Sequence, residues 1–435
     1  ARQELIDPFF VALGWDVHNE QHTAPQYRQV VPEQSLDVEG QKKAPDYAFC
    51  QATTTRFFVE AKKPGVAIKT AVGPAYQLRR YAWSAKLPLS LLTDFEELAV
   101  YDCRSRPSEK HKASVGRINF YTVEEYPDRW REIWDVFSRE SVWGGSFDQY
   151  TRAGKGRGTS EVDAEFLREI EGWRDVLARN MAIRNPGLGI DDLNDAVQRT
   201  IDRLIFLRMA EDRQVEPYEQ LGRLTNKENV YAELIDLCRK ADASSNAGLF
   251  NLSPTGDRIT PALTVDDKVL KPIITGLYFP HCPYEFSVLP IMVLGNIYEQ
   301  FLGKVIRLTA AHQAKVEEKP EVKKAGGVYY TPAYIVDYIV KNTVGKLVED
   351  KSPKQLAAFR VLDAACGSGS FLLGVYQCLL DYYLRWYIEH NPDKYPNAVW
   401  QRGEEWRLTI AEKKRILTTH TFGVDIDRQA VEVTK

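Results

Sequence analysis

The chain has 435 residues, of which 44% are hydrophobic and 27% are charged, and its formal net charge at pH 7 is −3. This length exceeds what one hydrophobic core usually serves, so we expect two to four globular units. The slightly acidic balance excludes a globally basic protein. Any contact with nucleic acid must therefore come from local surfaces.

Membrane and secretion signals are missing from the sequence. No stretch of about 18 apolar residues occurs, and the most apolar segment, 286–298, is interrupted by Pro290 and Gly295. The six cysteines include no Cys-x-x-Cys pair, which favours reduced thiols. The chain begins at Ala1 without a methionine or a secretion leader, so we infer that its first residues were trimmed or not recorded. We expect a soluble, cytoplasmic protein with no membrane partner.

Residues 1–151 are predicted to form a small α/β domain. Short β-rich runs at 57–59, 89–92 and 98–101 alternate with helical segments. The next residues, 152–158, contain no apolar side chain larger than alanine, which is typical of a linker.

Within this domain, Pro45-Asp46 precedes an apolar run, and Glu60-Ala61-Lys62 follows the apolar residues 57–59. Glu60 and Lys62 lie two apart, so a strand places them on one face. Two carboxylates and the Ala61 carbonyl form an oxygen-rich set suited to Mg²⁺, and a lysine beside them can position or deprotonate the attacking water. The pattern predicts phosphodiester hydrolysis, although charged residues are frequent enough here to produce it by chance.

A downstream helix adds Gln77 and Tyr81, four residues apart and hence on one helical face. With Pro45 before Asp46 and the apolar run before Glu60, this constellation resembles the PD-(D/E)xK nucleases. Its Gln-x-x-x-Tyr element is similar to that of restriction motor subunits and fused restriction-modification enzymes.

The resemblance implies that Asp46, Glu60 and the Ala61 carbonyl bind the metal and that Lys62 is the catalytic lysine. Gln77 and Tyr81 would support the site or touch the DNA backbone.

Three further residues have weaker assignments by the same resemblance. Arg79 and Arg80 could add phosphate contacts. Glu4, on a predicted first helix, matches the family's acidic residue that contacts a metal-bound water, but a solvated helix residue is an equal interpretation.

Residues 159–314 are predicted to be an all-helical connector. Val197, Ile201, Leu204, Ile205 and Arg208 recur at three-to-four spacing. The start of that helix would be capped by Asp191 or Asp192, and a second apolar helix is expected at 286–302. The charges of 315–325 alternate in sign around a proline, which indicates a solvent-crossing linker.

Residues 326–435 alternate between helices and strands in the manner of a parallel βαβ sheet. A predicted strand at 359–362 runs into a turn with two glycines, where a ligand can approach the backbone closely. A second strand ends at Asp425, whose carboxylate can accept hydrogen bonds from ribose hydroxyls. This pattern alone equally fits a dinucleotide or flavin site, or glycines that serve only tight packing.

Two details favour another cofactor: the third glycine of the dinucleotide pattern is missing, and Tyr-Thr-Pro lies about thirty residues upstream. The set resembles the gamma-class N6-adenine DNA methyltransferases, which use S-adenosylmethionine. By that resemblance, one group of residues covers the methionine end of the cofactor: Tyr330, Thr331 and Pro332. A second group lines the cofactor along the turn: Asp363, Ala365, Gly367, Ser368 and Gly369. Asp425 would hold the ribose, and Ile426 would pack on the adenine.

The family's Asn-Pro-Pro-Tyr/Phe loop, which receives the target adenine, does not occur in these residues. We expect it beyond Lys435, so that 326–435 is a truncated methyltransferase domain of a longer polypeptide.

Taken together, the motifs resemble the fused type IIG (type IIL-like) restriction-modification enzymes over essentially the whole chain. The implied fold is α/β and multidomain: a PD-(D/E)xK nuclease, an all-helical connector and the start of a Rossmann-like methyltransferase. The implied partners are Mg²⁺, S-adenosylmethionine and double-stranded DNA in a bacterial or archaeal cytoplasm. A C-terminal recognition domain outside these residues would give specificity, and cleavage could involve transient self-association.

Two alternatives stay open at this point. One is a phage-defence methyltransferase with a degenerate nuclease-like front, and the other is a DNA-binding scaffold in which both sites are vestigial.

Overall fold

The computed structural model describes residues 2–21, 23, 28–32, 45–51, 54–153, 162–245, 252, 257–289, 303–309, 311–318, 331, 333–402, 405–426, 431 and 434. The chain divides into two units, and each comprises several segments. The first contains Ala1–Arg168, Leu204–Leu237 and Asp267–Pro290, and the second contains Glu169–Arg203, Cys238–Asp266 and Ile291–Lys435. Among the described helices, none is both long and apolar enough to span a bilayer.

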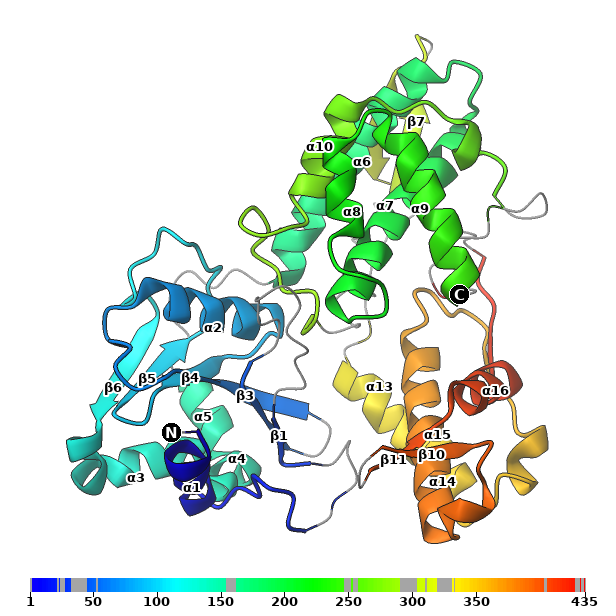
Figure 1. The fold of residues 1–435 in the computed structure, drawn as a ribbon. Coiled ribbons are helices and arrows are strands. Elements are labelled where there is room, and N and C mark those ends of the chain that lie inside the picture. The colour runs from blue at the N-terminus through cyan, green and yellow to red at the C-terminus, as the bar shows by residue number, and fades with distance from the viewer. Residues whose placement is uncertain are drawn as a thin grey trace. The chain divides into compact units, whose positions relative to one another are not determined.

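A six-stranded sheet is the centre of the first unit (Figure 1). Its spatial order follows the sequence, and every neighbouring pair is antiparallel except β3 and β4, which are parallel. The strands are β1 Val30–Pro32, β2 Tyr47–Gln51, β3 Thr54–Ala61, β4 Leu89–Thr93, β5 Glu97–Asp102 and β6 Arg117–Thr122. The three β-rich runs of the sequence lie in β3, β4 and β5, so those predictions are confirmed.

Helices cover both faces of this sheet because alternate strand residues point to opposite sides. On one face, α1 (Asp7–Ala12) and α3 (Tyr126–Phe137) pack on a core in which Phe49 and Phe57 stack with ring centroids 4.6 Å apart. On the other face, α2 (Val72–Ser84) packs against β3 and β4. The β3–α2–β4 crossover therefore places α2 directly over the carboxyl end of β3.

The helical part of the chain follows α4 Arg139–Gly144 and α5 Ser146–Ala153. Its helices are α6 Val162–Arg184, α7 Ile190–Asp212, α8 Gln220–Arg223, α9 Val230–Ser245 and α10 Asp267–Thr275. The predicted apolar stripe of α7 is buried, and Arg208 within it is only 3% exposed. Helix α5 extends to Ala153, so the first two residues of the predicted linker 152–158 are helical, and the rest of it lies outside the described residues.

The prediction of an all-helical connector up to residue 314 is wrong. Strands β7 (Lys304–Leu308) and β8 (Ala314–Glu318) pair as an antiparallel hairpin, so the first part of the predicted linker 315–325 is also a strand. The charged residues at the start of the predicted linker instead belong to a strand of this hairpin: Glu317 of β8 pairs with Arg307 of β7 at 3.4 Å, and Ile306 of β7 is buried. Of the predicted helix 286–302, only 286–289 are described, and these residues form a turn at 286–288 instead of a helix; the rest lies outside the described residues.

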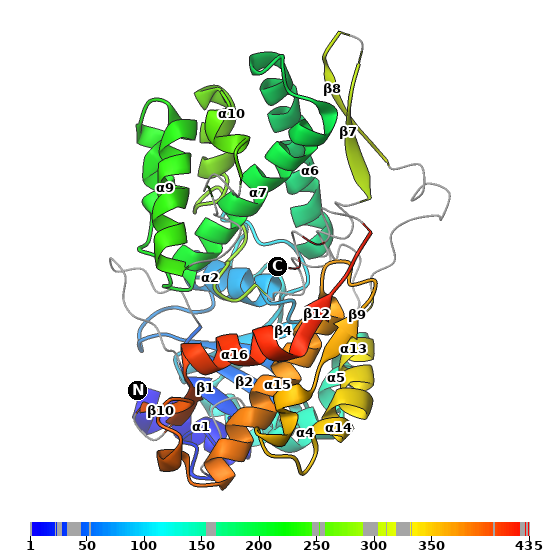
Figure 2. The same cartoon turned by 90° about the vertical axis from the view of Figure 1, so that its right-hand side faces the viewer.

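The C-terminal part of the second unit places a parallel strand pair beside long helices (Figure 2). Strand β9 pairs with β12 in the register Val361↔Thr421 to Asp363↔Gly423, which confirms the predicted parallel arrangement. Thr409 caps the start of α16 (Ile410–His420): its hydroxyl accepts a hydrogen bond from the Glu412 amide at 3.1 Å. The elements are α13 Ala333–Val340, α14 Lys346–Val348, β9 Val361–Asp363, α15 Ser370–Glu389, β10 Val399–Arg402, β11 Glu405–Leu408, α16 Ile410–His420 and β12 Thr421–Gly423.

Short helical turns complete the described structure. Two are π-helical, Arg2–Ile6 and Lys341–Gly345. The 3₁₀ turns are Val123–Glu125, Leu224–Asn226, Thr260–Ala262, Gln355–Ala358 and Pro392–Lys394.

The side chain of Asn194, on α7, anchors the β7–β8 hairpin. Its side-chain amide donates to the Ile306 carbonyl and accepts from the Ile306 amide, each at 2.9 Å, in a buried setting. The Asn194→Ala substitution leaves both backbone groups without these partners, at about 1–3 kcal/mol for each buried group. We expect amide hydrogen exchange at Ile306 to accelerate by at least about tenfold. Exchange unchanged from the parent, or changed equally by Asn342→Ala on an exposed helix position, contradicts the assignment.

Candidate functional site

Asp46 and Glu60 come together where β2 begins and β3 ends. The Asp46 carboxylate accepts a hydrogen bond from the Ala61 amide at 2.7 Å, so it lies against the peptide that joins Glu60 to Ala61. Asp46 is 2% exposed and Glu60 is 0% exposed. Arg2 donates to the Asp46 carbonyl at 2.6 Å and approaches its carboxylate at 3.5 Å. The antiparallel pairing of β2 with β3 therefore joins two acids that are fourteen residues apart in sequence.

Lys62 contacts both the strand and the helix above it. Its Nζ atom donates to Glu60 Oε1 at 2.6 Å and to Gln77 Oε1 at 3.1 Å. Its backbone amide donates to the Thr93 carbonyl of β4 at 2.8 Å, which fixes the chain just after β3 ends. The predicted shared face of Glu60 and Lys62 is thus present, and Gln77 lies on it.

Tyr81 occupies the next turn of α2 and is 2% exposed. Burial raises the pKa of its phenol well above the ordinary value, and the charges of Glu285 and Glu60 raise it further. Gln77 hydrogen-bonds to this phenol and also to Lys62. Tyr81 is therefore a neutral phenol at physiological pH that supports Gln77.

The donor set suits a hard divalent cation. Two buried carboxylates and the Ala61 carbonyl offer oxygen ligands, and Mg²⁺ is usually held by one or two carboxylates while water and substrate complete its shell. No cluster of three or more His, Cys, Asp or Glu side chains that could hold a metal occurs in the part of the chain that the structure describes. The set at β3 therefore offers the kind of oxygen ligands that Mg²⁺ prefers.

Glu4, one of the residues with a weaker assignment, has the exposed position that the solvated-helix interpretation expects. Glu4 is exposed on the first helical turn, whereas Asp7, three residues later, is buried and accepts a hydrogen bond from the Tyr47 hydroxyl.

The prediction that Arg79 and Arg80 face DNA phosphates is wrong for this structure. Arg79 is 2% exposed, with Nη1 at 3.2 Å from His111 Nδ1. Arg80 forms an ion pair with Glu285 at 3.2 Å. Both guanidiniums are directed into the protein because α2 is covered on more than one side.

The second site lies at the carboxyl ends of β9 and β12. The Val424 amide donates to the Asp363 carbonyl at 2.8 Å, and the Cys366 amide donates to the Val424 carbonyl at 2.9 Å. The Gly367 amide then donates to Asp425 Oδ2 at 2.9 Å. The glycine turn and the acid after the second strand, 58 residues apart in sequence, are thus held together as predicted from the parallel pairing.

Two glycines of this turn adopt positive φ angles, 52° at Gly367 and 82° at Gly369. Asp363 Oδ1 accepts from the Ala365 amide at 3.1 Å, and the Ser368 hydroxyl lies 3.2 Å from that of Ser370. These contacts produce a tight turn whose amides can approach a ligand.

Asp425 is partly buried, and Ile426 after it is fully exposed. Of the Tyr-Thr-Pro group, only Thr331 is described, as partly buried, while Tyr330 and Pro332 lie outside the described residues.

Comparison with known proteins finds a matching family model, a curated relative and two similar solved structures. A family model described as N-6 DNA Methylase matches residues 291–383. RM.Eco57I of Escherichia coli, a type II restriction enzyme and methyltransferase, is 34% identical over 434 residues, which cover 99% of this chain and 43% of that protein. The chain therefore spans less than half the length of this curated relative.

Two solved structures are similar at a lower level. The match to a DrdV–DNA complex has a TM-score of 0.30 at 10% identity. It covers 93% of this chain and 33% of the DrdV chain. The match to the type IIG restriction endonuclease BpuSI has a TM-score of 0.25 at 13% identity. It covers 88% of this chain and 38% of the BpuSI chain.

Gly369 provides a test of the turn. A Cβ atom built there meets Thr434 Cγ2 at 2.7 Å, and the residue holds a φ of 82°. The left-handed backbone costs a residue with a side chain about 1–2 kcal/mol. We expect Gly369→Ala to accelerate amide hydrogen exchange at Gly367. The matched control is Gly172→Ala, in α6, where a Cβ meets nothing within 4 Å. Equal exchange in the two variants contradicts the strained turn.

Proposed function

We propose that this chain is part of a type IIG restriction-modification enzyme with an N6 methyltransferase domain, and that it combines two activities in one polypeptide. One is Mg²⁺-dependent cleavage of double-stranded DNA by the site at β3. The other is transfer of a methyl group from S-adenosylmethionine to N6 of adenine by the domain that includes β9 and β12. The contact of Lys62 with both Glu60 and Gln77, beside Asp46, is the observation that carries the nuclease half.

The nuclease proposal assigns one role to each side chain. Asp46, Glu60 and the Ala61 carbonyl would hold Mg²⁺. Bound there, the cation would offset the negative charge that develops on the phosphate during cleavage.

Lys62 serves the attacking water in this proposal. An ammonium has three N–H groups, and two of them reach Glu60 Oε1 and Gln77 Oε1. The third can donate to a phosphate oxygen or to the water that attacks it. Gln77 limits the rotation of Nζ, so the ammonium is oriented before DNA binds.

The methyltransferase proposal uses the turn after β9. Its backbone amides and the side chains of Asp363 and Ser368 would line S-adenosylmethionine, Asp425 would accept from the ribose hydroxyls, and the exposed Ile426 would pack on the adenine ring. The positive φ angles of Gly367 and Gly369 support this fit, since they bring the backbone into a tight turn without side chains. The match to the N-6 DNA Methylase family favours this cofactor over a dinucleotide.

The substrate class follows from both halves. Double-stranded DNA in a bacterial or archaeal cytoplasm is the proposed substrate, and the sequence it must contain would be chosen by a recognition domain elsewhere in the enzyme. Transient pairing of two enzyme molecules would let two nuclease sites act on two strands.

Removal of Lys62 or Asp46 tests the nuclease assignment. In the full-length enzyme, we expect Lys62→Ala and Asp46→Asn each to lower Mg²⁺-dependent cleavage of plasmid DNA by at least about 100-fold, since each removes a group at the reacting phosphate. Methylation, followed by transfer of a tritiated methyl group, stays at the parent rate. EDTA should stop cleavage by the unaltered enzyme.

The matched control is Lys63→Ala, which changes the exposed lysine next in sequence. Cleavage by Lys62→Ala at the rate of Lys63→Ala would exclude the site at β3 as the nuclease, and would favour a methyltransferase with an inactive front.

Asp425 tests the cofactor assignment. Loss of hydrogen bonds to a charged acceptor costs about 1.5–3 kcal/mol, so Asp425→Ala should weaken binding of S-adenosylmethionine by about 10- to 100-fold. Isothermal titration calorimetry on the full-length enzyme measures this, with Asp393→Ala, an exposed acid before β10, as the control. Binding by Asp425→Ala as tight as by the control rules out the ribose contact.

A further inference from the structure

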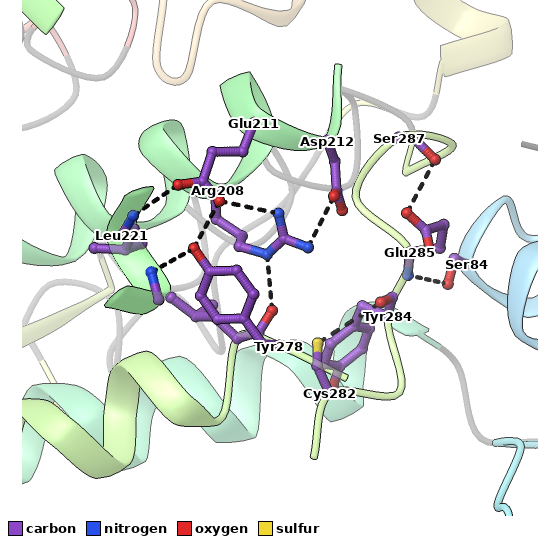
Figure 3. Close-up of polar contacts among 12 residues, drawn as sticks. Ser84, Arg208, Glu211, Asp212, Leu221, Tyr278, Cys282, Tyr284, Glu285 and Ser287 are labelled. Carbon is purple, nitrogen blue, oxygen red and sulfur yellow. Dashed lines mark hydrogen bonds and ion pairs between the residues drawn. The ribbon is translucent and has the colours of Figure 1, made fainter. Parts of the chain in front are cut away.

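The outer turns of α2 bind a distant segment of the chain, residues 282–289. Arg80 pairs with Glu285 at 3.2 Å and donates to the Tyr284 carbonyl at 2.6 Å. Ser84 Oγ accepts from the Glu285 amide at 2.8 Å (Figure 3). Trp83 stacks on Tyr284 with ring centroids 5.4 Å apart. Three residues of one helix thus hold two residues that lie about two hundred positions later.

The end of α7 binds the chain just before this segment, at Leu277 and Tyr278, and reaches Glu285 within it through Asp212. Arg208 pairs with Asp212 at 2.8 Å and donates to the Leu277 carbonyl at 2.9 Å. The Tyr278 ring lies 4.4 Å below the Arg208 guanidinium, and its hydroxyl donates to Glu211 at 2.6 Å. Figure 3 shows this network between the helix and the loop. All these residues belong to the first unit.

Glu285 is the residue at which the two sets of contacts meet. It is 3% exposed and forms an ion pair with Arg80. It also accepts a hydrogen bond from the Ser287 hydroxyl at 3.1 Å and hydrogen-bonds to Asp212. The buried charges around it are unequal: the three carboxylates of Glu211, Asp212 and Glu285 face the two guanidiniums of Arg80 and Arg208. Burial, followed by the charge of Asp212, raises the pKa of Glu285 to about 7.

The stripe of α2 that binds Glu285 also supports Lys62. Gln77, Arg80, Tyr81 and Ser84 are spaced three or four apart, so they follow one side of the helix. Tyr81 senses the charges of both Glu285 and Glu60, and Gln77 accepts from Lys62 at 3.1 Å. A shift of α2 by a fraction of a turn would move Gln77 and release Nζ of Lys62.

We propose that Glu285 is a positioning residue of the nuclease site: it fixes the stripe of α2 that orients Lys62, and it does so from outside the sheet domain. The inference rests on the proposed nuclease function. Glu285 touches neither the two acids nor the reacting phosphate in this assignment, so it acts only through Arg80, Ser84 and Tyr81. The region that sequence analysis treats as a connector therefore contributes to DNA cleavage.

The first test separates positioning from substrate binding. In the full-length enzyme, Glu285→Ala should lower the single-turnover rate of Mg²⁺-dependent cleavage by at least about tenfold, because a small displacement of a catalytic group has such an effect. The KM for DNA and the methylation rate should stay within about twofold of the parent. Glu285→Gln keeps the size and most hydrogen bonds, so it should recover most of the cleavage rate.

The second test uses pH. Arg80 and Tyr81 face Glu285 from α2, Arg208 and Asp212 face it from α7, and Tyr218 adds a further nearby titratable group. The pKa of Glu285 is higher in the folded protein than the ordinary 4.5, so its contribution to stability is lost as pH rises from there to about 7. Exchange protection of the Glu285 amide, corrected for intrinsic rates, should therefore fall over this range in the parent enzyme. It should stay flat in Glu285→Gln.

A control variant separates failure of the positioning role from failure of the nuclease assignment. Glu233→Ala removes a glutamate whose ion pair with Lys227 is exposed on α9, and it should change neither activity. Cleavage by Glu285→Ala at the Glu233→Ala rate, while Lys62→Ala is inactive, overturns the positioning role and leaves the nuclease assignment intact. Cleavage by Lys62→Ala at the parent rate overturns the nuclease assignment itself. If Glu285→Ala loses both methylation and cleavage, the variant has unfolded, and Ser84→Ala becomes the deciding variant. Ser84→Ala removes only the hydroxyl that accepts from the Glu285 amide. It must then impair cleavage and leave methylation unchanged, or the proposal fails.

Discussion

The position of one ammonium group depends on two elements that meet only in the folded protein. Lys62 Nζ lies between Glu60 on β3 and Gln77 on α2, and the Lys62 amide is bound to β4. The buried Glu60 carboxylate needs a cationic or hydrogen-bonding partner at this place, because an isolated charge in a low-dielectric interior is costly. The sheet, the crossover helix and the two acids are therefore constrained together, and the remaining polar contacts of the site follow from that constraint.

The local parts of both sites were predictable from sequence. Alternation along a strand places Glu60 and Lys62 on one face, and the four-residue spacing of Gln77 and Tyr81 places them on one side of a helix. The parallel pairing that joins the glycine turn to Asp425 followed from the order strand, helix, strand. These inferences need only the periodicity of a single element or one crossover, and the structure confirms that each pair shares its face.

Contacts that depend on tertiary packing were not predictable. Arg79 and Arg80 look like exposed basic residues in a helix, and nothing near them in sequence shows that His111 and Glu285 cover them. The hairpin at 304–318 was mistaken for helix and linker. A segment with alternating charges has the same composition in a strand with one buried face as in a linker surrounded by solvent. Asn194, more than a hundred residues earlier, supplies the buried partner that decides between the two.

The contact between Trp83 and Tyr284 also limits how the enzyme could be divided or recombined. The sequence suggests a nuclease module that ends near residue 151, yet such a fragment would lack the chain that covers Arg80, Trp83 and Ser84. A buried guanidinium and an indole would then face water, and the fragment would tend to associate through that surface. Exchange of nuclease modules between relatives would require matched residues at both ends of this contact, so the transferable unit is discontinuous in sequence.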